Sequence, residues 1–129
     1  MKETEIEFST SITEINHCLI ATIPGEMSDD EVRTLINRIM DKVDALDLSG
    51  AVLDFSVIGV LDTYAFTAFK NVSRALNLMG IKVIWAGLKP GVICALIDLN
   101  IAIDDSQIQA ALNLEHALAI LKEGYKHEC

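Results

Sequence analysis

Three short apolar runs, each followed closely by a helical pattern of apolar residues, constrain the fold of this chain more than any other feature. The runs are CLIATI at 18–23, AVLDF at 51–55 and IKVIWAG at 81–87. Each run has the length of a buried strand, and the segment behind it carries apolar residues at spacings of three and four. Strands that alternate with amphipathic helices predict an α/β domain with a central, partly parallel sheet.

Recognisable capping signals mark where the expected helices begin and end. Residues 28–31 (SDDE) form a capping box, in which the Ser28 hydroxyl and the Glu31 carboxylate each accept a backbone N–H. Asp62 opens a second helix that Gly80 ends, and the KPG at 89–91 starts a third. The inner faces that we expect are Val32, Leu35, Ile36, Ile39, Met40 and Val43; then Phe66, Phe69, Val72, Leu76 and Met79; and then Val92, Ile93, Leu96 and Ile97.

The two ends of the chain carry weaker patterns. Residues 1–14 are expected to add an edge strand or to form an arm, and a short apolar stretch lies at 101–103. A last helix is expected from about 113 to 122, with 123–129 as a flexible tail. A length of 129 residues suits a single domain over 1–129 with a core of its own.

Charge and composition exclude several classes of function. The formal net charge of −9 would repel the phosphates of a nucleic acid and an anionic membrane surface. The chain start has no apolar signal core and no uncharged run reaches the ~18 residues of a membrane span, so we expect a cytoplasmic protein. The three cysteines are far apart and lack C-x-x-C spacing, which predicts reduced thiols, with Cys94 as a small core residue.

No set of residues suggests an enzyme or a cofactor site. His17, His116 and His127 all lie away from the sheet edge where a catalytic group is expected, so a Ser-His-Asp or Cys-His arrangement has no support. The chain contains neither a P-loop nor a G-x-G-x-x-G motif. His127 and Cys129 are interpreted as parts of a frayed tail rather than as metal ligands.

Acidic residues gather at two of the expected helix starts. Glu26, Asp29, Asp30 and Asp62 could in principle hold a divalent cation. Asp29 and Asp30 are better explained as first-turn carboxylates that interact favourably with the helix dipole. We therefore expect no metal here.

The loops that follow the three strands should meet at one edge of the sheet. Right-handed crossovers place loops 24–28, 56–62 and 87–90 at the carboxyl ends of parallel strands, where function is usual in open α/β sheets. The polar residues at this edge form a candidate partner-binding surface: Ser28, Asp29, Ser56, Asp62, Thr63 and Lys89.

Asp62 and Thr63 have two compatible interpretations. Asp62 is a good helix N-cap and Thr63 would then be the first helical residue, which is a purely structural role. A hydroxyl at that position also points outward and is accessible to a kinase. A phosphate on it would add about −1.5 to −2 charges and three acceptor oxygens.

Several motifs resemble the STAS family of sulphate transporter and anti-sigma factor antagonist domains. LDFS at 53–56 followed by VLDT at 60–63 is similar to the phosphoacceptor motif of that family. LMGIKV at 78–83, GLKPGV at 87–92 and ALNLEHAL at 111–118 resemble its stressosome branch. The similarity extends from about residue 15 to residue 121.

The resemblance implies a STAS fold and a non-enzymatic signalling role in the bacterial cytoplasm. Thr63 would be the phosphoacceptor and Asp62 its preceding acid. A second acceptor threonine that some sensor proteins carry aligns with Asp29, which a serine/threonine kinase cannot modify. The implied partners are sensor-type STAS paralogues, a serine/threonine switch kinase that the complex sequesters until it phosphorylates its STAS subunits, and a matching phosphatase. A homodimer and a large hetero-oligomer are also implied.

Three interpretations remain open within this resemblance, and the first is a stressosome subunit, either the scaffold or a sensor paralogue. The short chain is typical of the stressosome scaffold subunit, whereas threonine at position 63 is typical of the sensor paralogues, because scaffold members commonly have serine there. A stand-alone antagonist that binds an anti-sigma kinase one to one is a further possibility. A STAS module that binds a nucleotide or a lipid at the same edge is the third.

Overall fold

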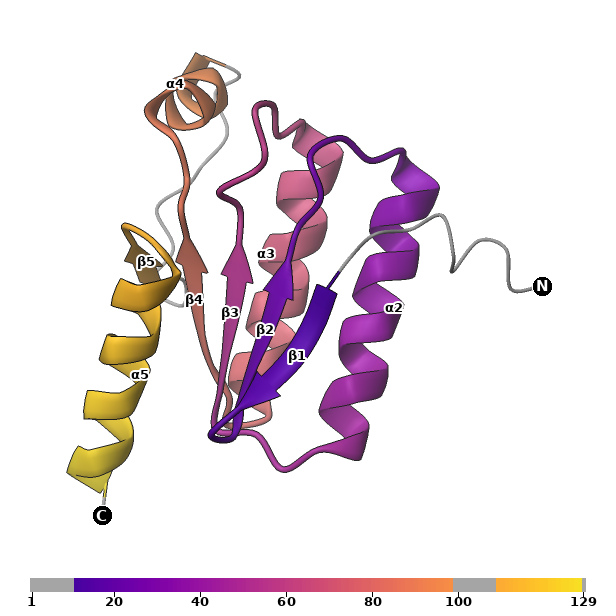
Figure 1. The fold of residues 1–129 in the computed structure, drawn as a ribbon. Helices are drawn as coiled ribbons and strands as arrows, with labels where there is room; N and C mark the ends of the chain where they lie inside the picture. Colours follow the sequence, from indigo (N-terminus) through magenta and orange to yellow (C-terminus); the bar gives the residue numbers. More distant parts are fainter. Residues whose placement is uncertain (1–10, 99–108, 129) are drawn as a thin grey trace.

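A partly parallel sheet forms the centre of the computed structural model, which describes residues 11–98 and 109–128 (Figure 1). The strands are β1 (Ser11–Ile15), β2 (Cys18–Thr22), β3 (Gly50–Asp54), β4 (Lys82–Ala86) and β5 (Gln109–Ala111). They lie side by side in that order, with β1 antiparallel to β2 and every later pair parallel. The predicted α/β class with a partly parallel sheet is therefore confirmed.

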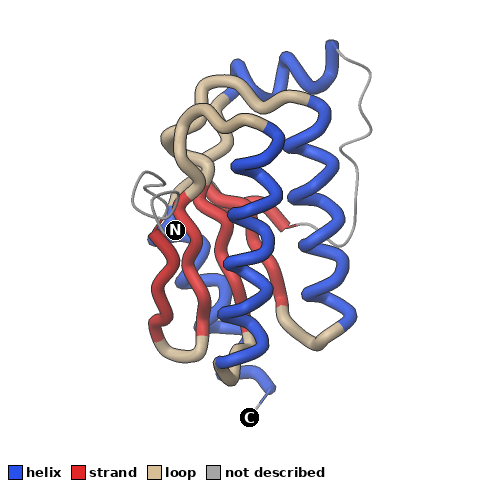
Figure 2. Tube along the Cα trace, turned by 90° about the vertical axis from the view of Figure 1, so that its right-hand side faces the viewer, coloured by secondary structure: helices blue, strands red, loops and turns tan. Residues whose placement is uncertain are grey.

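Helices cover both faces of the sheet. Helices α2 (Asp29–Ala45) and α3 (Thr63–Leu78) lie on one face, and α5 (Leu114–Glu128) lies on the other (Figure 2). The short helix α4 (Pro90–Asp98) lies beyond the carboxyl ends of the strands, at the top of Figure 1. The loops after β2, β3 and β4 meet at this same edge, as the crossover rule predicts.

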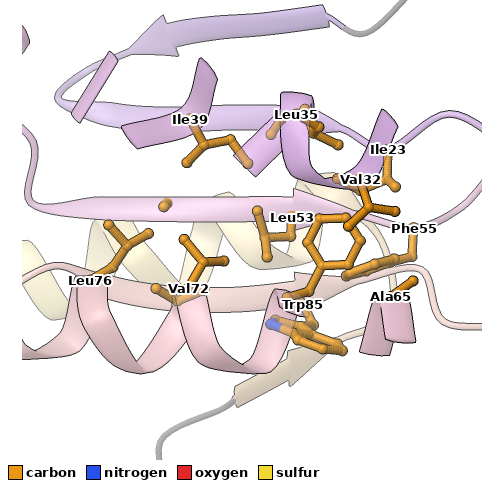
Figure 3. Close-up of a cluster of buried hydrophobic side chains, with 14 of the residues drawn as sticks. Ile23, Val32, Leu35, Ile39, Leu53, Phe55, Ala65, Val72, Leu76 and Trp85 are labelled. Atoms are coloured by element: carbon orange, nitrogen blue, oxygen red, sulfur yellow. The ribbon is translucent and has the colours of Figure 1, made fainter. Parts of the chain in front are cut away.

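Two apolar clusters hold the layers together. The larger one fills the space between the sheet and α2 and α3, with Leu53 and Phe55 at its centre (Figure 3). The smaller one lies between the sheet and α5 and includes Val52, Ile84 and Leu121. Alternate residues of β3 thus point to opposite faces, and both faces are buried, which explains the nearly continuous apolar sequence of this strand.

The capping box at the start of α2 is confirmed in both directions. The Ser28 hydroxyl accepts the backbone N–H of Glu31 at 3.2 Å, and the Glu31 carboxylate accepts the backbone N–H of Ser28 at 2.8 Å. The apolar face behind it is also correct, because Val32, Leu35 and Ile39 are buried.

Several predicted inward-facing residues point outward instead. Met79 is 55% exposed because α3 ends at Leu78 and the chain turns at Gly80, where φ is +85°. Ile97 is 58% exposed and Cys94 is exposed, so the prediction that Cys94 is a core residue is wrong. Helix α4 lies above the sheet edge rather than on a face.

The predicted ends of the chain are only partly covered by the structure. The edge strand β1 begins at Ser11, and residues 1–10 as well as the apolar stretch 101–103 lie outside the described residues. Helix α5 continues to Glu128, well past the helix end expected at 122. The segment 123–128, expected as a flexible tail, is therefore helical.

Candidate functional site

The loop between β3 and α3 is fixed by backbone hydrogen bonds at its start. The Phe55 N–H donates to the Ala86 carbonyl of the neighbouring strand at 2.8 Å, and the Ile58 N–H donates to the Phe55 carbonyl at 3.1 Å. The Asp54 carboxylate accepts the Ser56 N–H at 3.0 Å, which closes a local turn. The chain therefore leaves β3 along a defined path.

An aromatic cluster holds the start of α3 against this loop. The Phe55 ring lies 4.7 Å from Trp85 and 5.5 Å from Phe69, and Phe66 lies 5.6 Å from Trp85, all measured between ring centroids. The Trp85 indole N–H donates to the buried Ser73 hydroxyl at 2.9 Å. Contacts of this kind between rings make a rigid support for whatever the loop presents.

Asp62 caps α3, as predicted. Its carboxylate accepts the Ala65 N–H at 2.8 Å and its carbonyl accepts the Phe66 N–H at 2.9 Å. Thr63 is the first residue of the helix and its side chain is exposed. The cap is made by Asp62, so the Thr63 hydroxyl is not needed to begin the helix.

A cavity of about 450 Å³ lies between the starts of α2 and α3. Two of the predicted edge residues, Ser28 and Asp62, line it together. Its other walls are Gly25, Glu26, Met27, Glu31, Ile58, Val60, Leu61 and Ala65. The cavity combines carboxylates with apolar side chains, and the exposed Thr63 directly follows its lining residue Asp62.

The other predicted edge residues are spread more widely. Ser56 lies on the α5 side, where it lines a second cavity of about 510 Å³ with Asn113 and Leu114. Lys89 is exposed just before α4, and Asp29 is exposed as the first residue of α2. The structure therefore divides the predicted edge in two, with Ser28, Asp29, Asp62 and Thr63 at the starts of α2 and α3.

The surface around the starts of α2 and α3 is strongly acidic. Residues 24–36 and 55–69 contain a single cationic side chain, that of Arg33. They contain five carboxylates: Glu26, Asp29, Asp30, Glu31 and Asp62. Within 11–98 and 109–128, no three His, Cys, Asp or Glu side chains come together in a way that could hold a metal ion.

Arg33 and Tyr64 were missed in the sequence analysis. The Arg33 guanidinium donates to the Tyr64 hydroxyl at 3.5 Å and also pairs with the Asp30 carboxylate. The hydrogen bond to Tyr64, followed by the charge of Asp30, raises the pKa of Arg33 above its usual value. No pattern in the sequence predicts this contact, because it joins residues that are far apart in the chain.

Two exposed valines were also missed. Val57 is 57% exposed and Val60 is 70% exposed, and both lie in the loop that leads to Thr63. Their presence in a loop, outside any helical or strand periodicity, is a signal that could have identified them. The two side chains add exposed apolar surface to the loop that precedes Thr63.

None of the helices in the described part of the chain is both long enough and apolar enough to cross a membrane.

The family predicted from the motifs is confirmed by comparison. The chain matches the family model described as the STAS domain over residues 9–110. It is similar to the RsbT co-antagonist protein RsbRD of Bacillus subtilis (strain 168), with 30% identity over 130 residues. That alignment covers 99% of this chain and 45% of the relative, so the chain spans less than half the length of this curated relative.

Solved structures share the fold. A variant of RsbS from Moorella thermoacetica superposes with a TM-score of 0.80 and 24% identity, over 92% of this chain and 98% of that one. A chain from a structure described as the molecular architecture of the stressosome has a TM-score of 0.73 and 22% identity, over 89% and 98% of the two chains. These likenesses confirm the predicted STAS fold.

Proposed function

The chain belongs to the STAS domain family, and we propose on that premise that it is a non-enzymatic, phosphorylatable regulator in a bacterial stressosome-type complex. The observation that carries the proposal is that Asp62 caps α3 while the neighbouring Thr63 hydroxyl takes no part in the cap. Asp62 makes the helix cap, and Thr63 is exposed beside it on a rigid aromatic support. A hydroxyl that has no structural task is free to receive a phosphate.

The modification itself requires a partner kinase and ATP. The Thr63 Oγ1 attacks the γ-phosphorus of ATP, so that an Oγ1–P bond forms, the bond to the bridging oxygen breaks, and ADP leaves. The hydroxyl proton passes to a base of the kinase. The serine/threonine kinase therefore supplies the chemistry, and this chain supplies the acceptor.

The added charge changes the surface more than the fold. The dipole of α3 favours a phosphate at its first turn by about 0.3–1 kcal/mol. The neighbouring Asp62 carboxylate opposes it by about 1–3 kcal/mol. The two terms have opposite signs and partly cancel, so the new charge mainly disturbs a protein that is docked beside Thr63, over the exposed Val57 and Val60.

The proposed partners follow from the family. The chain would assemble with sensor-type STAS paralogues as a homodimer within a large hetero-oligomer in the cytoplasm. The complex would hold a switch kinase until Thr63 is phosphorylated, and a matching phosphatase would reset it. Similarity to the named relatives supports this proposal. Because position 63 is a threonine in a short chain, the proposal includes both the scaffold role and the sensor-paralogue role.

Phosphopeptide mapping tests the modification directly. Incubation with the cognate kinase and ATP should add one phosphate to the wild-type chain, located at Thr63. Thr63→Ala should remove the modification without lowering the melting temperature, and Thr63→Ser should retain it. Thr67→Ala removes another exposed threonine one turn further along α3 and is the matched control. A phosphate found elsewhere, with Thr63 unmodified, would reject the proposal.

The size of the complex separates the alternatives. Co-expression with a sensor paralogue should produce a particle in the megadalton range. A stand-alone antagonist would form only small complexes with its kinase. A ligand-binding module would instead show a raised melting temperature with a nucleotide or a lipid in the absence of any kinase.

A further inference from the structure

Arg33 is a cationic side chain of α2 that contacts the start of α3. Arg33 projects from the second turn of α2 and reaches the hydroxyl of Tyr64, which directly follows Thr63. We propose that Arg33 is the intramolecular receptor of the Thr63 phosphate, and that phosphorylation moves it from Asp30 and Tyr64 onto the phosphate oxygens. This inference rests on the proposed function, since it takes Thr63 as the modified residue.

The charges around Thr63 favour Arg33 as the side chain that binds the phosphate. Arg33 is the single cationic side chain of residues 24–36 and 55–69, where Glu26, Asp29, Asp30, Glu31 and Asp62 supply five negative charges. A phosphate would add about −1.5 to −2 more. Within these segments, only Arg33 can offset the additional charge.

Arg33 contacts the residue that directly follows Thr63. The Cα atoms of Thr63 and Tyr64 are ~3.8 Å apart along the chain, and the Arg33 guanidinium already contacts the Tyr64 side chain. The side chains of Arg33 and Asp30 are 61% and 83% exposed, so neither is held in place by packing. Arg33 can change rotamer without disturbing the core.

Phosphate is the stronger partner for a guanidinium. Arg33 now pairs with one carboxylate and with a neutral phenol at 3.5 Å, which is a long hydrogen bond. A phosphate dianion accepts two parallel N–H bonds from a planar guanidinium and carries more charge than a carboxylate. Arg33 should therefore leave its present partners when the phosphate arrives.

The consequence is a rearrangement of charge across the starts of both helices. Arg33 belongs to α2 and Thr63 to α3, so their pairing would bridge the cavity that Glu31 and Asp62 line. Asp30 would lose its cation and become an unpaired carboxylate at the surface. A docked partner would thus meet a changed pattern on α2 as well as a phosphate on α3.

Titration of the phosphate tests the pairing. Phosphothreonine is incorporated at position 63 during translation, and its second pKa, ordinarily about 6, is followed by ³¹P NMR. Arg33→Gln should raise that pKa by about 0.5–1 unit, because the dianion loses its cation. Lys42→Gln removes the same charge from the same helix, but ~13 Å further along the helix axis than Arg33. It should shift the pKa of the phosphate by less than about 0.2 unit.

A second pair of variants keeps Arg33 and removes a carboxylate from the same helix instead. Asp30→Asn and Asp29→Asn each delete one negative charge in the first turn of α2, but only Asp30 binds Arg33 in the structure. Asp30→Asn should therefore lower the phosphate pKa further than Asp29→Asn does. The other charged groups near the phosphate are Glu26, Glu31 and Asp62, and they are unchanged in both variants.

Equal titration curves within each pair would overturn the inference. Because the phosphate is installed without a kinase, that result would leave the proposed modification of Thr63 standing. Conversely, a kinase that leaves Thr63 unmodified would reject the proposed function, whatever the titrations show. The two failures are therefore distinguishable.

Discussion

Asp62 and Thr63 are neighbours with different tasks, and the stability of α3 depends on only one of them. The Asp62 carboxylate accepts the Ala65 N–H, one of the amides that have no partner within the helix. Thr63 contributes a backbone position and an exposed hydroxyl. If Thr63 is phosphorylated as we propose, this separation would let its charge change while the helix stays formed.

The cap can be tested by a pair of substitutions at one position. Asp62→Ala should lower the free energy of unfolding by about 1 kcal/mol, because the Ala65 N–H loses its acceptor. Asp62→Asn keeps an oxygen in the same place and should restore most of the loss. Urea denaturation measures both values. Equal losses in the two variants would show that the carboxylate acts by charge rather than as a cap.

The buried thiol of Cys18 makes stability depend on pH in alkaline solution. Burial raises the pKa of Cys18 above its ordinary value of 9.0, because the fold disfavours the thiolate. The unfolded chain then loses its proton first as the pH rises. The contribution is therefore fully present below pH 9 and is lost as the pH passes through the raised folded-state value.

Substitution of each cysteine isolates this effect. In Cys18→Val the free energy of unfolding should fall less steeply above pH 9 than in the wild type. Cys94→Val removes an exposed thiol and should leave the wild-type profile unchanged. Chemical denaturation at a series of pH values provides the curves. Parallel profiles for wild type and Cys18→Val would contradict the prediction.

At the scale of elements, the support of the site depends on a close approach between two loops. Gly87 directly follows β4 and has a φ of +78°, and a Cβ built on it would lie 2.9 Å from the Cβ of Ser56 and 3.0 Å from its Cα. The loop after β3 can therefore pack against the end of β4 only if position 87 has no side chain. Gly80 has a similar φ of +85°, but open space surrounds it.

Gly80 and Gly87 share a positive φ and differ in the space around them, so one serves as the control for the other. Gly80→Ala should lower the free energy of unfolding by about 1 kcal/mol, which is the cost of a side chain in the left-handed region. Gly87→Ala should cost at least about 2–3 kcal/mol, because it also forces the Ser56 backbone to move. Denaturant unfolding distinguishes the two. Equal losses would mean that the loop after β3 adjusts freely.

Patterns among neighbouring residues predicted which helices and strands form better than they predicted where each one ends. The capping box at Ser28, the cap at Asp62 and the short apolar strands are properties of a few neighbouring residues, so the sequence alone identifies them. Met79 and Ile97 continue a helical spacing but are exposed, because a helix that ends or leaves the sheet face no longer buries its apolar stripe. The spacing of apolar residues does not show where a helix stops packing against the sheet.

At the scale of the whole molecule, the class of the fold follows from the alternation of strands and helices, but the assembled surface does not. The cavity between α2 and α3 and the contact of Arg33 with Tyr64 depend on how elements distant in sequence pack together. Thr63 was found from a motif, whereas its neighbours Val57 and Val60 lack any motif. The resemblance predicted Thr63 as the acceptor, and the structure shows the residues that surround it.

We propose that phosphate on Thr63 releases a bound kinase. The most direct measurement is the amount of kinase that remains on the complex of this chain with a sensor paralogue, determined by mass analysis before and after ATP is added. We expect ATP to release the kinase from the wild-type complex and to leave it bound when the chain carries Thr63→Ala. Equal release from both complexes would show that Thr63 does not control the binding of the kinase.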